Sequence, residues 1–205
     1  MKHFDLRSVA ASLIDVIWAG LLWIVCSLPI LTLGASTTAL YYTVVKCVRH
    51  GRGNLTGSFF KAFGSNFRQA TLLWLLMLLW LFIGLTDLYC LRYMGLRPGH
   101  ALYSLSCLLL LPIPVLFPWL FAFLSRFHNT LGGTLKCAAF LALRHIGVTL
   151  LLLAELVGSA LLCWLVPQLI PLLPGLLCLL MSLSVEPVFR TLTEDQTEGD
   201  DWYNE

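Results

Sequence analysis

Long apolar runs, separated by prolines, glycines and charged residues, constrain the fold of this chain more than any other feature of its sequence. They cover residues 9–31, 35–48, 70–91, 101–123, 146–166 and 175–185. A helix of about 20 apolar residues crosses a bilayer, and hydrocarbon offers no partners to a backbone that is neither helical nor closed into a barrel. The runs therefore predict an all-α, polytopic transmembrane bundle of about six membrane helices, with one or two interfacial amphipathic helices.

The composition supports the membrane class and excludes several others. Of the 205 residues, 59% are hydrophobic and 12% are charged, against about 45–50% and about 25% in soluble domains. A disordered chain and a nucleic-acid-binding protein are excluded. The seven cysteines form no C-x-x-C pair and lie mostly in apolar runs, so they are expected to act as small hydrophobic residues. We expect one transmembrane domain over residues 1–190 and a poorly ordered acidic tail over 191–205.

Lysine and arginine are distributed unevenly between the two sides of the predicted bundle. If all six runs cross, eleven of the 13 lie on the side of both termini, and only Arg92 and Arg97 lie opposite. Because cytoplasmic loops are enriched in Lys and Arg, this predicts a multi-pass protein of the bacterial cell membrane with cytoplasmic N- and C-termini. Run 35–48 is short for a crossing, and without it the division becomes nine against four, so the sequence leaves its path open.

Prolines and aromatic residues predict local irregularities. Three prolines at positions 112, 114 and 118 predict a kinked or broken helix in run 101–123. Phe59, Phe63 and Phe67 recur at every fourth position, which predicts that residues 58–69 form an amphipathic helix at the interface or packed on neighbouring spans. Asn66 is expected away from the centre of its apolar face. A second such helix is predicted over residues 134–143.

Residues 32–38, Thr-Leu-Gly-Ala-Ser-Thr-Thr, hold the most specific local pattern. A turn ends here and a helix begins, which Ser36 or Thr37 is expected to cap. The glycine lets another backbone approach closely, and threonine hydroxyls near a helix start can hold an anion or a polar ligand. The alternative is a helix-hairpin turn in which the same hydroxyls satisfy the backbone. The candidate residues are Thr32, Gly34, Thr37 and Thr38.

Two carboxylates lie inside predicted spans. Glu155 is near the centre of run 146–166, where a charged group costs roughly 2.5–3.5 kcal/mol on insertion scales. It is expected to be either a proton or substrate site or a neutral acid hydrogen-bonded between helices. Asp15 lies about two turns into the first run and is expected to pair with Arg68 or Arg144, which would fix orientation or assembly.

Charged residues at the ends of spans are given structural roles. Asp87 is expected to pair with Arg92 or Arg97 at the outer edge, and Glu186, with Arg190, to cap the last span at the inner surface. His128 and His145 show no convincing metal-ligand spacing. No Walker motif and no Gly-x-Ser-x-Gly elbow occurs, so we predict no catalytic residue, no metal, no cofactor and no enzymatic activity.

Residues 28–42 and 59–67 carry a recognisable pattern of a proline–glycine break, a small-residue helix start and a phenylalanine repeat. The matching positions are Pro29, Thr32, Gly34, Thr38, Ala39, Leu40, Tyr41, Phe59, Phe60, Phe63, Asn66 and Phe67. This pattern resembles the YesL-like family of small bacterial membrane proteins, common in Gram-positive bacteria. Members often sit near genes for ATP-driven carbohydrate transporters, so the resemblance implies an accessory role in sugar uptake. No catalytic or ligand residue is established for that family.

The sequence therefore predicts a non-enzymatic integral membrane protein, accessory to carbohydrate uptake by an ABC-type transporter. Its expected partners are the lipid bilayer and either permease and ATPase subunits or a second copy of itself, with no nucleic acid. The alternative is an autonomous small-solute transporter or channel that uses intramembrane carboxylates. The candidate functional residues are Glu155, Asp15, Thr32, Gly34, Thr37, Thr38 and Asn66.

Overall fold

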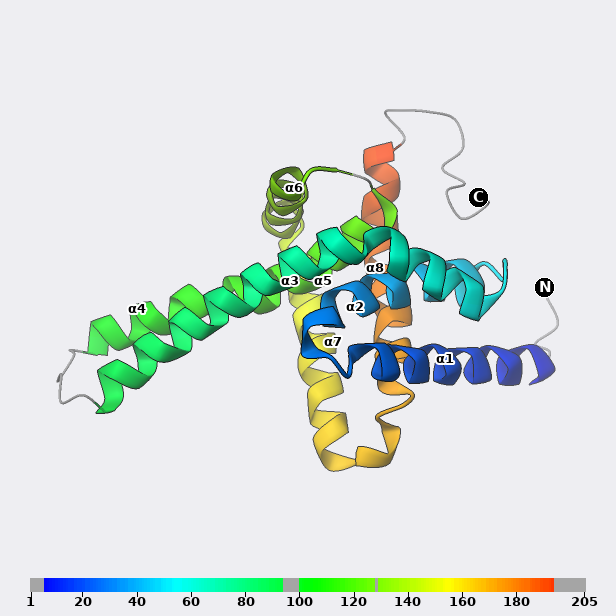
Figure 1. Ribbon diagram of the computed structural model, residues 1–205, viewed down its shortest axis with the longest axis horizontal. Helices are drawn as coiled ribbons and strands as arrows, with labels where there is room; N and C mark the ends of the chain where they lie inside the picture. Colours follow the sequence, from blue (N-terminus) through cyan, green and yellow to red (C-terminus); the bar gives the residue numbers. More distant parts are fainter. Residues whose placement is uncertain (1–5, 94–99, 128, 194–205) are drawn as a thin grey trace.

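The computed structural model describes residues 6–93, 100–127 and 129–193, which fold into helices and short connections (Figure 1). No strand occurs among these residues, so the prediction of an all-α fold is confirmed. The predicted acidic tail lies largely outside them. The α-helices are α1 (Leu6–Ser27), α2 (Leu33–Thr43), α3 (Leu55–Tyr93), α4 (His100–Leu110), α5 (Pro112–Arg126), α6 (Leu131–Arg144), α7 (Ile146–Leu165) and α8 (Leu173–Thr193). The shorter elements are the 3-10 turns η1 (Ile30–Thr32) and η3 (Pro167–Leu169) and the π-helical segment η2 (Val44–Arg49).

Four helical stretches in the described residues are long and apolar enough to cross a membrane. They are Leu55–Tyr93, Leu105–Arg126, Ile146–Leu165 and Leu173–Leu192. In α3 and α7, only 11% of the most apolar window is buried inside the protein. Apolar faces of this extent point to a lipid surrounding. The apolar part of α1, Ser12–Ser27, is shorter, so crossings by runs 9–31 and 35–48 stay predictions.

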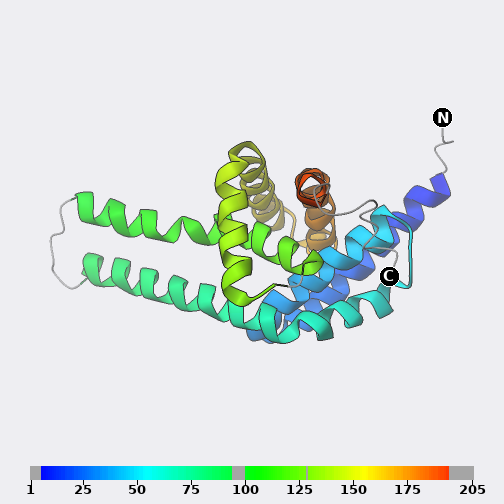
Figure 2. The same cartoon turned by 90° about the horizontal axis from the view of Figure 1, so that it is seen from above.

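Two helical hairpins project from a shared body in different directions. Helix α3 has 39 residues, about 58 Å at 1.5 Å per residue, and it lies antiparallel to α4 and α5 (Figure 1). The far end of α3 and α4 form an arm with no other helix beside it, as both views show (Figure 2). The second hairpin, α7 and α8, points downwards in Figure 1.

Helix α2 is the centre of the packed body. Most of its residues are buried, and they are predominantly glycine, alanine, serine and threonine. Small side chains let helix backbones approach closely inside a membrane. A Cβ placed on Gly34 would lie 2.6 Å from the carbonyl oxygen of Ala70 on α3 and 2.7 Å from Cβ of Trp74, so only glycine fits there. The core continues into α5 around Trp119 and into α8 around Phe189, both fully buried.

The predicted separate amphipathic helix over residues 58–69 is wrong, because α3 runs through this segment and the following span without interruption. No proline or turn sequence separates the two parts. The buried face also differs from the predicted one. Phe59 is fully buried, but Phe67 is 41% exposed, and Asn66, expected away from the centre of the apolar face, is only 5% exposed. The small residues Ala62 and Ala70 complete this face because α2 packs closely against it.

The predicted proline break is confirmed. Helix α4 ends at Leu110 and α5 begins at Pro112, where the missing N–H groups of the first turn need no partner. A tight turn follows α7, as predicted, with η3 at its start. Helix α8 continues through Pro187 to Thr193 and so is longer than the predicted span 175–185. The predicted helix over residues 134–143 is present as α6.

Candidate functional site: a buried polar cluster and an apolar cavity

The threonines of residues 32–38 bond to nearby backbone. Thr32 Oγ1 donates to the carbonyl of Pro29 at 2.7 Å, Thr37 Oγ1 to Leu33 at 2.7 Å and Thr38 Oγ1 to Gly34 at 3.0 Å. Neither Ser36 nor Thr37 caps the helix start, since α2 begins at Leu33 with Thr32 as its N-cap and no side-chain cap bond. Each hydroxyl thus donates to a backbone carbonyl of the turn or of the first turns of α2, as in the hairpin-turn alternative.

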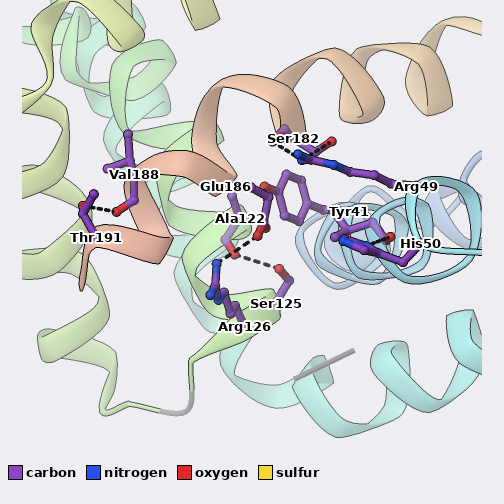
Figure 3. A network of polar contacts seen from close by, with 11 residues as sticks. Tyr41, Arg49, His50, Ala122, Ser125, Arg126, Ser182, Glu186, Val188 and Thr191 are labelled. Atoms are coloured by element: carbon purple, nitrogen blue, oxygen red, sulfur yellow. Dashed lines mark hydrogen bonds and ion pairs between the residues drawn. The ribbon is translucent and has the colours of Figure 1, made fainter. Parts of the chain in front are cut away.

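Three helices meet at a buried polar cluster formed by Tyr41 of α2, Arg126 of α5 and Glu186 of α8 (Figure 3). Arg126 Nη1 donates to Glu186 Oε2 at 2.9 Å, and the Tyr41 hydroxyl donates to Glu186 Oε1 at 3.3 Å. The side chains of Arg126 and Glu186 are 1% and 4% exposed. A buried charge needs a partner of opposite sign. Arg126 and Glu186 meet this need for each other.

The surroundings of the cluster are aromatic and include a second arginine. The guanidinium carbon of Arg126 lies 5.3 Å from the ring centre of Phe127 and 5.6 Å from that of Phe189, within cation–π range. One turn before Glu186 on α8, Arg49 Nη1 of η2 donates to the carbonyl oxygen of Ser182 at 2.7 Å (Figure 3). The cluster thus ties α2, η2 and α5 to one face of α8.

The predicted role of Glu186 as an inner-surface cap with Arg190 is wrong. Glu186 is buried and accepts from α2 and α5, and the ion pair joins residues 60 positions apart. A signal for this was present in the sequence. Apolar residues continue past Glu186 at Val188 and Phe189, which shows that the buried helix face does not end at the carboxylate.

Glu155 lies in the middle of α7. Its Oε2 atom is buried and has no hydrogen-bond partner among the described residues. The predicted bond between helices is therefore not formed at this oxygen. The neighbouring Leu156 and the residue one turn later, Ser159, line the cavity described below.

The other polar residues singled out in the sequence lie outside the Tyr41–Arg126–Glu186 cluster. Asp15 is half-buried on α1, and neither Arg68 nor Arg144 lies within ion-pair distance of it among the described residues. Asp87 accepts a hydrogen bond of 2.5 Å from Ser106 Oγ on α4, and this bond joins the two helices of the arm. Its expected partner Arg97 lies outside the described residues, and no ion pair to Arg92 forms in the described part. Asn66 Nδ2 donates to the carbonyl of Ala62 at 3.1 Å within α3.

The part of the chain that the structure describes contains no metal-binding cluster and no disulfide. No group of three His, Cys, Asp or Glu side chains there could hold a metal ion, and His128 lies outside it. All seven cysteines are free thiols, and Cys47 and Cys178 are buried.

An apolar cavity of about 370 Å³ lies between α1, α2, α3, α5, α7 and α8. Its walls include Trp23, Trp74, Phe117 and Leu152, and Tyr41 stands in its wall while its hydroxyl reaches the polar cluster. The cavity falls in the usual size range of ligand sites, about 300–1,000 Å³.

Long apolar helices packed around a small-residue helix, with the buried ion pair of Arg126 and Glu186, define the class of polytopic helical membrane proteins. In comparisons with known families, residues 16–88 match the family described as "Protein of unknown function, DUF624", to which YesL-like proteins belong. The match covers α2 and most of α1 and α3. No curated protein and no solved structure matches the chain.

Proposed function

We propose that this protein is a non-enzymatic accessory component of carbohydrate uptake by an ABC-type transporter in the bacterial cell membrane. The resemblance of residues 28–67 to YesL-like sequences supports the sugar-uptake context. The chain crosses the membrane six times, with both termini cytoplasmic. The uneven distribution of Lys and Arg supports this orientation.

The observation that favours an accessory role over solute conduction is that the polar cluster joins helices of the body to one another. Tyr41 and Arg126 point at Glu186, and the bonds run between helices of the body. The large cavity beside the cluster is lined mainly by carbon. A sugar that crosses the protein needs hydrogen-bond partners along its path to replace those of water. Neither the polar cluster nor the apolar cavity provides a row of such partners.

Helix α6 supplies the surface for a partner in this proposal. It packs on α5 but leaves Phe140 and Leu143 55% and 74% exposed, beside the basic Arg144. An apolar face with a basic margin suits a helix at the cytoplasmic membrane surface, where transporter subunits meet.

Crosslinked affinity purification of the tagged protein from its native membranes tests this function. Stoichiometric recovery of permease, ATPase or sugar-binding subunits is the expected result, together with reduced sugar uptake after gene deletion. Leu143→Ser should reduce recovery, and Leu150→Ser, at a 61% exposed position of α7, should not. Recovery of the protein alone, with unaltered uptake of many sugars, would count against the proposal.

Glu155 favours a second candidate function, an autonomous transporter or channel for a small solute. A carboxyl oxygen that is buried in a spanning helix without a partner can take part in proton or ion movement. In liposomes the purified protein should then move solute, and Glu155→Gln should abolish the flux. Asp87→Asn, which changes a carboxylate outside the body, is the matched control. Inactive liposomes would exclude this alternative.

A further inference from the structure

The apolar cavity of about 370 Å³ has no part in the proposed role in sugar uptake. Its lining includes Trp74 of α3 and Phe117 of α5 from the first hairpin, and Leu156 of α7 and Leu177 of α8 from the second. Helix α2 contributes Leu40 and Tyr41 to its wall. Elements far apart in the sequence therefore enclose one space.

Water is a poor occupant of this space, because a buried water needs two to four polar partners. The hydroxyls in the wall are already engaged. Thr37 Oγ1 donates to Leu33 and accepts from the indole of Trp23 at 3.1 Å, and Ser159 Oγ donates to Leu156 at 2.8 Å. An empty space is also unfavourable, since every wall atom loses packing contacts and the penalty grows with volume.

The cavity reaches the protein surface. Two of its lining residues, Ala160 of α7 and Ile170 after η3, are exposed, the latter by 42%. Trp23 and Trp74 stand half-buried in the wall, and both indole N–H groups are bonded within the protein. Tryptophan is enriched at membrane interfaces, where one part of the side chain is apolar and the other polar. An elongated apolar group can enter here from the bilayer while its polar head stays at interfacial depth.

We propose that this cavity is a binding site for one acyl chain of a membrane phospholipid. The occupant is apolar because the wall leaves no polar group to satisfy. It comes from the bilayer because the rim lies on helices long and apolar enough to cross it. The acyl chain lies between α2, α5, α7 and α8.

Native mass spectrometry of the full chain, released from nanodiscs of phosphatidylglycerol and phosphatidylethanolamine, tests the site. The wild type should retain one phospholipid. Ala160→Phe, which places a phenyl ring where the cavity reaches the surface, should lower the lipid-bound fraction by about tenfold or more. Ala154→Phe is the matched control, because Ala154 is an exposed alanine of the same helix that does not line the cavity. A wild type without lipid, or an Ala160→Phe variant that retains it, would overturn the proposal.

A second measurement uses the wild type and so does not depend on the folding of any variant. Phosphatidylglycerol with a diazirine on its acyl chain should label the lining residues Cys178 and Met181 saturably. The lipid-facing residues Leu180 and Leu183 of the same helix, 41% and 55% exposed, should be labelled without saturation. Labelling of the exposed pair alone overturns the site. Lining-residue labelling by a diazirine fatty acid, but not by the phospholipid, overturns the assignment to phospholipid.

Discussion

Glu186→Gln tests whether the buried ion pair holds the helical body together. The substitution keeps the size of the side chain and removes its charge. The Arg126 guanidinium, 2.9 Å away on a side chain only 1% exposed, then loses the negative charge of this carboxylate. The loss is electrostatic and creates no cavity, so its size reports on the pair itself.

The expected magnitude follows from the distance and the burial. Two unit charges about 4 Å apart interact by about 4 kcal/mol at an effective dielectric constant of about 20. Removing one partner of a buried pair typically destabilises a protein by about 3–5 kcal/mol. We expect Glu186→Gln to lower the free energy of unfolding by this amount, a large share of the roughly 5–15 kcal/mol that stabilises a typical protein. Unfolding by SDS in mixed micelles, followed by tryptophan fluorescence, measures it.

Two further variants distinguish the loss of the ion pair from a general effect of a Glu→Gln substitution on stability. Glu155→Gln makes the same change at a carboxylate with an unpartnered oxygen, and it should cost less than about 1 kcal/mol. The double variant Arg126→Met with Glu186→Leu should recover much of the loss, because it removes both buried charges. The reasoning is refuted if the free energy of unfolding of Glu186→Gln lies within about 0.5 kcal/mol of the wild-type value. It is also refuted if the loss in the double variant equals the sum of the losses in Arg126→Met alone and Glu186→Leu alone.

Further predictions concern helix packing and topology. Gly34→Ala places a Cβ against the backbone of α3 and should destabilise by about 1–3 kcal/mol in the same assay, whereas Gly64→Ala, with open space around it, should stabilise by about 0.5–1 kcal/mol. Thr149→Val leaves the buried indole N–H that donates to it without a partner and should cost about 1–3 kcal/mol; an unchanged unfolding midpoint would contradict this. Alkaline phosphatase, active only outside the cytoplasm, should be active when fused at Gln168 and inactive when fused at Arg52, and the reverse pattern would invert the proposed orientation.

Local features of the sequence predicted the all-α fold class and the positions of several helix ends. The all-α fold, the proline break before Pro112, the turn after α7 and the helix α6 all follow from apolar run length and from backbone chemistry that acts over a few residues. Predictions that depended on which face of a helix is buried were less successful. Asn66 was expected away from the centre of the apolar face and lies in the core, because α2 packs closely against α3.

The partners of the buried groups were decided only by the tertiary structure. Apolar length predicts that a helix enters the membrane because the bilayer acts on each helix separately, whatever its neighbours are. Glu186 and Arg126, by contrast, lie 60 residues apart and meet only because α2, α5 and α8 converge. The cavity has the same origin, since its walls come from six helices. No single apolar run predicts the ion pair or the cavity, because the space between helices depends on how the helices pack against one another.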